Sequence, residues 1–171
     1  MIFVTVGSAD PFDRMIRAID DWAGARTRTD VFAQIGRSAY EPKHIEAVQF
    51  LSPSAFRQRV QTARLIVAHA GMGSIITALE AEKPIIIMPK RASLREHRND
   101  HQVATARRFV QKEGIIVAED EKDLIEKLDQ DAGLVAPTLI SREASPQLIA
   151  AIRTYIFSPV NQRRSMAKIS E

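Results

Sequence analysis

The residues best suited to chemistry form the run His69-Ala70-Gly71-Met72-Gly73-Ser74, which directly follows an apolar segment at residues 65–68. Its two glycines allow the backbone to pass close to a ligand, and Ser74 stands where a helix can begin. The free N–H groups and the positive dipole end of a helix N-terminus attract anions. A similar turn, Gly7-Ser8, follows the apolar segment at residues 2–6. Two such turns at one sheet edge could hold a diphosphate, although strand-to-helix turns also use glycine for structural reasons alone.

A polar block at residues 96–102 opens a predicted helix at the same sheet edge. Its Asn99, Asp100 and Gln102 can hydrogen-bond to sugar hydroxyls. The nearby histidines raise the question of a metal site. However, the pair at i and i+4 lacks the glutamate of a zinc-protease motif, and a histidine satisfied by hydrogen bonds is commoner than a metal ligand. We therefore expect neither a metal nor a cofactor here.

Missing motifs exclude several classes of protein. No G-x-G-x-x-G follows the first predicted strand and no Walker loop occurs, which argues against NAD enzymes and P-loop NTPases. Neither Tyr40 nor Tyr155 has a lysine four residues later, which disfavours a sugar-nucleotide epimerase or dehydrogenase. A nucleophilic serine is also disfavoured, because the G-x-S-x-G turn is absent. The formal net charge of only +3 and the small number of aromatic residues argue against nucleic acid as a partner.

Basic residues cluster in the loop at residues 90–98, where only Glu96 offsets them. Arginine suits carboxylate and phosphate recognition better than lysine does, because its guanidinium group is planar and donates two parallel hydrogen bonds. Solvated surface charge would explain the same cluster. The candidate anion-binding residues of this loop are Arg91, Arg95 and Arg98.

The elements that must position these residues alternate between short apolar runs and amphipathic segments. Such alternation is typical of an α/β fold with a single Rossmann-like, doubly wound parallel sheet. Ligands of such sheets bind at the carboxyl ends of the strands. The strands are expected at residues 2–6, 31–35, 47–51, 65–68, 84–88 and 115–117, and the helices after Pro11, at 52–63, 74–81, 99–112, around 123–128 and at 146–155.

The chain has the length of one domain, at 171 residues. Residues 1–157 are expected to form one Rossmann-like domain, and residues 158–171 a polar, basic C-terminal arm. No apolar run approaches the roughly 20 residues that span a bilayer, and the first residues lack the basic start of a signal peptide. Without cysteine there is neither a disulfide nor a zinc–thiolate site. A soluble cytoplasmic domain is therefore the expectation.

Several of these segments together resemble the C-terminal, donor-binding domain of family-28-type glycosyltransferases, one half of the GT-B fold. The resemblance covers about residues 1–130 and includes stand-alone subunits of two kinds. One is the catalytic subunit of the two-piece transferase that extends the dolichol-linked precursor with N-acetylglucosamine. The other adds glucuronic acid or galactose during exopolysaccharide and capsule synthesis. The segments are residues 1–7 with Phe12-Asp13-Arg14, residues 30–36, the run from His69 to Ser74, Lys83-Pro84 and Asn99-Asp100-His101-Gln102.

This resemblance implies that residues 1–157 form a nucleotide-sugar-binding domain, and it implies which residues meet a UDP-sugar donor. The family usually has a glutamate for the ribose hydroxyls where this chain has Thr77. Glu80 lies one helical turn further on, displaced by about 4.5 Å along the axis, so either side chain could make that contact. The donor-binding residues expected from the resemblance are Gly7, Ser8, His69, Gly71, Met72, Gly73, Ser74, Thr77, Glu80, Asn99, Asp100, His101 and Gln102.

The resemblance also implies a two-part enzyme, since this chain is too short to contain both halves of a GT-B transferase. A membrane-anchored partner subunit would bind the acceptor, a polyprenyl-diphosphate-linked sugar, and supply the catalytic base. The basic loop could then meet a glucuronate carboxylate, the acceptor diphosphate or anionic lipid. The chain would work without a metal at the cytoplasmic face of the membrane, and could self-associate without its partner. The alternative is a non-catalytic accessory subunit that enhances a partner transferase.

Overall fold

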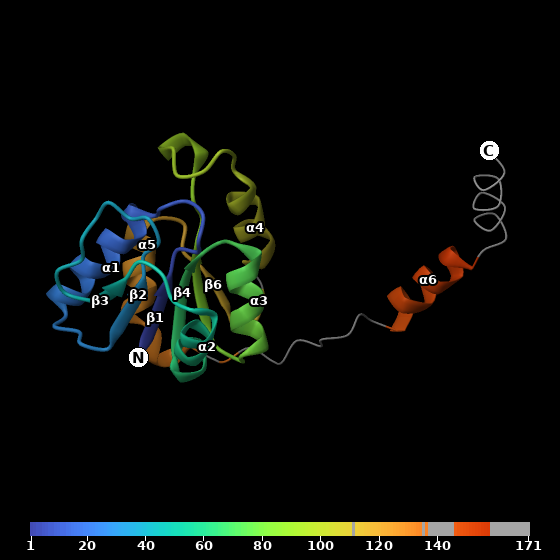
Figure 1. The fold of residues 1–171 in the computed structure, drawn as a ribbon, viewed down its shortest axis with the longest axis horizontal. Helices are drawn as coiled ribbons and strands as arrows, with labels where there is room; N and C mark the ends of the chain where they lie inside the picture. Colours follow the sequence, from blue (N-terminus) through green and yellow to red (C-terminus); the bar gives the residue numbers. More distant parts are fainter. Residues whose placement is uncertain (111, 135, 137–145, 158–171) are drawn as a thin grey trace. The chain divides into compact units, whose positions relative to one another are not determined.

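In the computed structural model of the protein, six parallel strands form one sheet in the order β3-β2-β1-β4-β5-β6 (Figure 1). The structure describes residues 1–110, 112–134, 136 and 146–157. The strand order reverses at β1, between its neighbours β2 and β4, which confirms the predicted doubly wound sheet. The strands are β1 (Ile2–Thr5), β2 (Val31–Gln34), β3 (Glu46–Val48), β4 (Leu65–His69), β5 (Ile85–Met88) and β6 (Ile115–Val117).

Helices cover both faces of the sheet (Figure 1). Helices α1 (Asp13–Ala25) and α5 (Glu121–Asp129) pack against each other on one face. The opposite face carries α2 (Pro53–Thr62), α3 (Met72–Glu80) and α4 (His101–Phe109). Two short 3-10 helices, η1 (Ala92–Leu94) and η2 (Asp131–Gly133), and a further helix, α6 (Pro146–Ile156), complete the elements.

Burial explains why these segments adopt these elements. All four residues of β5, Ile-Ile-Ile-Met, are fully buried, as expected for a parallel strand covered by helices on both faces. In α1, Met15, Ile16, Ile19 and Trp22 recur at helical spacing and are all buried. Their packing against β1 and α5 produces the main hydrophobic cluster. The sheet is thus held rigidly beneath the loops at its carboxyl edge.

A buried carboxylate fixes the connection between β2 and β3. Asp20 of α1 is fully buried and accepts hydrogen bonds from the Tyr40 hydroxyl and the N–H groups of Lys43, His44 and Ile45, at 2.7–3.1 Å. Although burial opposes ionisation, these four donors lower the pKa of Asp20. The hydrogen bond that the Tyr40 hydroxyl donates to the Asp20 carboxylate raises the pKa of Tyr40 to about 12.

Several element boundaries differ from the sequence-based expectation, and two of them have local reasons. The third strand was expected to reach residue 51 but ends at Val48, since the chain soon enters α2, which Ser52 caps. The helix expected from Asn99 begins at His101. The Asp100 carboxylate instead accepts the Ala92 N–H, so it fixes the preceding loop.

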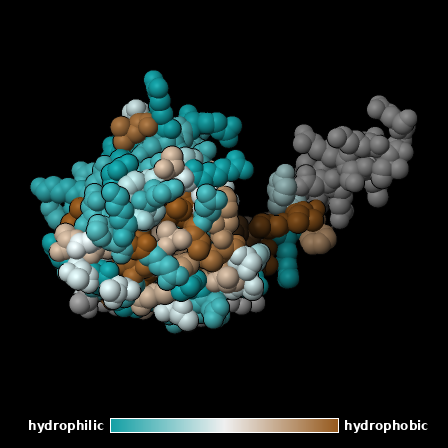
Figure 2. Space-filling model, turned by 60° about the vertical axis from the view of Figure 1, so that its left-hand side comes forward, coloured by the Kyte–Doolittle hydropathy of each residue, from teal (hydrophilic) through white to brown (hydrophobic). Residues whose placement is uncertain are grey.

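The chain divides into two compact units, Met1–Leu139 and Ile140–Glu171. The sequence-based expectation places a boundary after residue 157, whereas in this division α6 falls in the second unit. No residue of α6 is buried, and its exposed apolar side chains include Ile152 and Ile156. On the face of the first unit shown in Figure 2, hydrophilic side chains cover much of the surface, with smaller apolar patches between them. The expected arm at residues 158–171 lies outside the described residues. No helix in the described part of the chain is long and apolar enough to cross a membrane.

Candidate functional site

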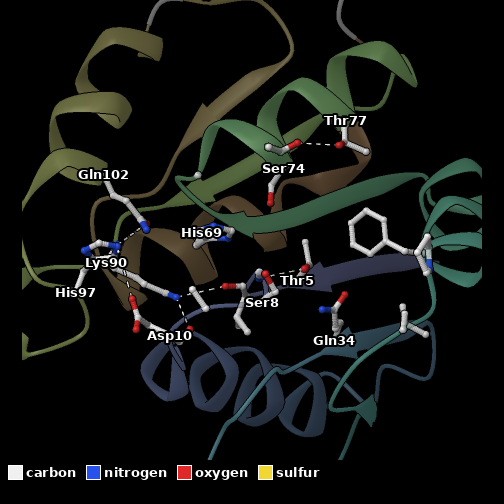
Figure 3. Close-up of a pocket in the computed structure, with 18 of the residues that line it drawn as sticks. Thr5, Ser8, Asp10, Gln34, His69, Ser74, Thr77, Lys90, His97 and Gln102 are labelled. Atoms are coloured by element: carbon white, nitrogen blue, oxygen red, sulfur yellow. Dashed lines mark hydrogen bonds and ion pairs between the residues drawn. The ribbon is translucent and has the colours of Figure 1, made fainter.

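A pocket of about 740 Å³ opens at the carboxyl ends of the strands (Figure 3). We call it the main pocket. The turns after β1 and β4 form its floor, and the first residues of α2 and α4 close its two ends. Its lining residues are Thr5, Val6, Gly7, Ser8, Ala9, Asp10, Gln34, Leu51, Pro53, Phe56, Arg57, His69, Gly71, Gly73, Ser74, Thr77, Glu80, Lys90, His97, His101 and Gln102.

The His69 imidazole packs between the two glycine turns predicted to hold a diphosphate. Gly7 has a positive φ of 79°, and a Cβ there would lie 2.7 Å from His69 Cε1. A Cβ on Gly71 would come closer still to His69 Nε2. Both positions therefore require glycine to leave room for the ring. Burial, assisted by the nearby Lys90 ammonium, lowers the pKa of His69 to about 4, so the ring is neutral near pH 7.

The N-terminus of α3 presents unpaired backbone donors beside these turns. Gly71 is the N-cap residue and has no side chain to cap the helix. Within the part of the chain that the structure describes, no hydrogen bond satisfies the N–H groups of Met72, Gly73 and Ser74. A Cβ added to Gly73 would meet nothing within 4 Å, so this backbone borders open space. The Met72 side chain is about half exposed and does not line the main pocket, unlike Ser74.

A buried lysine fixes the turn after β1. The Lys90 ammonium donates to the carbonyls of Val6 and Asp10, and only 2% of the residue is exposed (Figure 3). Burial lowers the pKa of Lys90, while the negative charge of the Asp10 carboxylate opposes that shift. The backbone N–H of Lys90 donates to the side-chain oxygen of Gln102 at 3.2 Å. Gln102, expected to face the donor sugar, therefore also holds the backbone that carries this lysine.

Thr77 and Glu80, the two candidates for a ribose contact, both line the main pocket. The Thr77 hydroxyl donates to the Gly73 carbonyl at 2.7 Å, so its proton is already used. No hydrogen bond or ion pair engages the Glu80 carboxylate within the described ranges. Glu80 is therefore the better acceptor for hydroxyl groups of a ligand.

The pocket end beside α2 was missed by the sequence-based prediction. Leu51, Pro53 and Phe56 give it an apolar wall, and the Phe56 ring meets that of Phe3 edge to face at 5.3 Å. Gln34, at the end of β2, is buried, and its side-chain oxygen has no hydrogen-bond partner. An unpaired buried oxygen in a pocket wall is a position where a ligand donor would be favourable. The only sequence signal was a polar residue ending an apolar strand.

The predicted polar block at residues 96–102 divides into two groups. His97, His101 and Gln102 line the main pocket, and the rings of His97 and His101 meet edge to face at 4.5 Å. Asn99 and Asp100 do not line it. The Asn99 side-chain oxygen instead bonds to His101, and the Asp100 carboxylate to the Ala92 N–H. The side-chain oxygens of both residues are thus used to shape the loop, and the prediction that they bind a donor sugar stays a prediction.

The three candidate anion-binding arginines also separate. Arg91 donates to the Glu119 carbonyl at 2.7 Å, away from the main pocket. Arg95 and Arg98 line a neighbouring cavity. Within the described residues, no group of three or more His, Asp or Glu side chains is arranged to hold a metal ion.

Comparisons with known proteins bear on the family and the fold of the chain. The model of the glycosyltransferase family 28 C-terminal domain matches residues 1–136. The chain is 35% identical over 107 residues to the UDP-N-acetylglucosamine transferase subunit ALG13 of Eremothecium gossypii, a match that covers 60% of this chain and 49% of that protein. The chain thus spans about half the length of this curated relative.

Solved structures share the fold. The solution structure of ALG13 superposes with a TM-score of 0.58 at 18% identity, and the match covers 92% of this chain and 96% of that one. The UDP-GlcNAc 2-epimerase of Methanocaldococcus jannaschii, solved with UDP-GlcNAc and UDP, gives 0.59 at 15% identity over 90% of this chain and 45% of that one. Because the family model covers most of the 171 residues, the chain belongs to the family of glycosyltransferase family 28 C-terminal domains.

Proposed function

We propose that the chain is the donor-binding subunit of a glycosyltransferase that uses a UDP-sugar. One observation carries this proposal: the unpaired N–H groups at the start of α3 border the main pocket between two glycine turns. Such an arrangement suits a diphosphate, which would accept from these donors and interact favourably with the helix dipole. Membership of the glycosyltransferase family and the similarity to transferase subunits support the same function.

The chemistry of the pocket walls suggests how the donor would lie. The base would pack on the apolar wall at Leu51 and Phe56, with the Gln34 side chain within the same pocket. The ribose hydroxyls would donate to Glu80. The diphosphate would occupy the turns at Gly7 and Gly71, which leaves the sugar toward the first residues of α4. A pocket of about 740 Å³ falls in the range typical of sites for small ligands.

In the proposed reaction an acceptor hydroxyl attacks the anomeric carbon with inversion, and the bond to the diphosphate oxygen breaks. The leaving UDP takes the bonding electron pair, and the N–H groups of α3 stabilise its charge. His69 is neutral near pH 7 and adds no positive charge. No metal or other cofactor is needed in this scheme. The acceptor proton would pass to a base on the partner subunit.

The donor sugar and the partner are further parts of the proposal. Relatives named as UDP-N-acetylglucosamine transferase subunits favour UDP-N-acetylglucosamine as the donor. The sequence resemblance to exopolysaccharide and capsule subunits favours glucuronic acid or galactose instead. The word "subunit" in those names supports assembly with a second chain. We propose a membrane-anchored partner that binds a polyprenyl-diphosphate-linked acceptor. The chain would then work at the cytoplasmic face of the membrane and self-associate when the partner is absent.

Calorimetric titration with UDP, and with ADP as the control nucleotide, tests the donor site. We expect UDP to bind selectively and Glu80→Gln to weaken it by about tenfold, because a charged acceptor for the ribose is lost. Glu82→Gln is the matched control, since Glu82 is exposed and does not line the main pocket. Titration with UDP-N-acetylglucosamine, UDP-glucuronate and UDP-galactose then identifies the sugar. Equal affinity for UDP and ADP would contradict the proposal.

A non-catalytic accessory role is the second candidate. It is favoured by the engagement of the Thr77 hydroxyl with the Gly73 carbonyl, which weakens any ribose contact at that position. An accessory subunit need not bind a nucleotide. Absence of UDP binding both by the chain alone and by its complex with the partner would support this role.

A further inference from the structure

A second cavity of about 590 Å³ lies beside the main pocket, between the start of α1 and the loop that contains η1. We call it the arginine cavity, after Arg95 and Arg98 in its lining. It shares two wall residues, Asp10 and His97, with the main pocket. A group bound there would therefore lie next to whatever occupies the main pocket.

Most charges around the arginine cavity are already paired. Arg14 donates two hydrogen bonds to the Glu96 carboxylate, at 2.6 and 2.9 Å, and a third to Glu121 at 2.8 Å. The Asp13 carboxylate accepts from the Ser38 hydroxyl and the Ala39 N–H. Arg14 and Glu96 neutralise each other, whereas the two donors to Asp13 are neutral, so the Asp13 carboxylate keeps its negative charge.

Two cations in the cavity wall remain available. Throughout the described residues, no hydrogen bond or ion pair engages the guanidinium groups of Arg95 and Arg98. Asp10, another carboxylate of the wall, interacts with the Lys90 ammonium and lies 3.6 Å from His97 Nε2. The cavity thus offers two free guanidinium groups, against the partly compensated carboxylate of Asp10 and that of Asp13 at the start of α1.

The loop that carries these arginines is held in place. The Glu96 carboxylate accepts the Arg91 N–H at 2.9 Å and also binds Arg14, so it ties the loop to α1. Arg95 has a left-handed backbone conformation, with φ of 58°, that a glycine would adopt more easily. The Arg98 N–H donates to His97 Nδ1 at 2.8 Å and orients that shared ring. The cavity wall is therefore largely formed before a ligand arrives.

We propose that the arginine cavity binds a phosphate or diphosphate ester that belongs to the acceptor, a step that rests on the proposed function of the main pocket. Guanidinium groups match phosphate oxygens through paired hydrogen bonds, and two of them match a diphosphate. The donor diphosphate would already be held by backbone N–H groups in the main pocket. A second anion site next to it would place the acceptor hydroxyl near the donor sugar, at the wall formed by Asp10 and His97.

Titration of the full chain with isopentenyl diphosphate in the presence of saturating UDP tests this proposal. We expect binding that persists under UDP and weakens by about tenfold or more in Arg95→Gln/Arg98→Gln, because two charge-assisted contacts are lost. Arg107→Gln/Arg108→Gln is the matched control. It removes the same charge from exposed residues in the last turn of α4 and should leave the affinity within about twofold.

Three results would overturn the proposal. The first is that isopentenyl diphosphate does not bind in the presence of UDP, and the second is that both double variants bind it equally well. The third is that Arg95→Gln/Arg98→Gln loses affinity for UDP-glucuronate but not for isopentenyl diphosphate. The last result would assign these arginines to a donor carboxylate instead. Failure of UDP to bind would count against the main pocket. In that case the arginine cavity would still be supported if isopentenyl diphosphate binds in the absence of UDP. This binding must then weaken in Arg95→Gln/Arg98→Gln and not in Arg107→Gln/Arg108→Gln.

Discussion

The packing of His69 between two glycines leads to a prediction that separates stability from binding. Gly71 has φ of −92° and ψ of 136°, which any residue can adopt, so an added methyl group costs nothing in backbone strain. Its cost comes from the clash with the His69 ring. Gly71→Ala should therefore destabilise the fold by about 1–3 kcal/mol, the usual range for overpacking a filled site.

Gly73→Ala is the matched comparison, two residues along the chain. Its Cβ would meet nothing within 4 Å, and alanine in the first turn of α3 should leave stability unchanged or raise it by up to about 1 kcal/mol. The same methyl group would project into the proposed diphosphate site. We therefore expect Gly73→Ala to keep the fold and weaken UDP binding by about tenfold, the equivalent of roughly 1.4 kcal/mol.

Urea unfolding followed by the fluorescence of Trp22, the only tryptophan and a buried residue, measures the stability of each variant. A double-mutant cycle with His69→Ala isolates the clash. Gly71→Ala/His69→Ala should be more stable than the sum of the single effects by about 1–2 kcal/mol, because the ring that clashes is gone. Additive effects, or a neutral Gly71→Ala, would refute the explanation.

Three further predictions concern buried polar groups. The pKa of His69 is lowered to about 4 in the folded chain, so the unfolded chain binds a proton at a higher pH than the folded chain does. The free energy of unfolding should therefore fall by up to about 3 kcal/mol as the pH drops from about 6.5 to 4. In urea titrations, His69→Gln should flatten this pH dependence. Asp20→Asn should cost about 2–4 kcal/mol in the same assay, because the amide cannot accept from the Tyr40 hydroxyl and all three N–H groups; retention of stability would contradict this. Lys90→Met should weaken UDP binding by about tenfold in calorimetry while the fold persists, because the turn after β1 loses its tie to the Val6 carbonyl; unchanged affinity would show that the lysine does not position that turn.

The sheet and the two glycine turns could be predicted from the sequence because their signals are local. Runs such as residues 85–88 are apolar throughout, and the segment from His69 to Ser74, which contains Gly71 and Gly73, directly follows another apolar run at residues 65–68. The helical spacing of its apolar residues also predicts helix α1. The family resemblance, expected over about residues 1–130, is confirmed by the match over residues 1–136.

Features that depend on tertiary contacts could not be predicted. Lys90 stands in a basic cluster that indicates a solvated surface, yet its ammonium is buried against two carbonyls more than 75 residues away along the chain. Asn99 and Asp100 have the right chemistry for sugar hydroxyls, but the loop uses their oxygens. In the sequence, Phe56 is only an apolar position of a predicted helix. It lines the main pocket because α2 packs beside the glycine turns, a tertiary contact that the sequence does not show.

The strand order has a consequence for the dynamics of the main pocket. Its two glycine turns follow β1 and β4, central strands with neighbours on both sides, whose amides should exchange with solvent only on global unfolding. Its apolar wall at Leu51 instead follows β3, a three-residue edge strand with no buried residue. That edge should open by local unfolding at a much smaller free-energy cost. A nucleotide that contacts both regions would slow hydrogen exchange mostly in β3. Exchange at the two glycine turns would change little, because the strands that carry them are already stable.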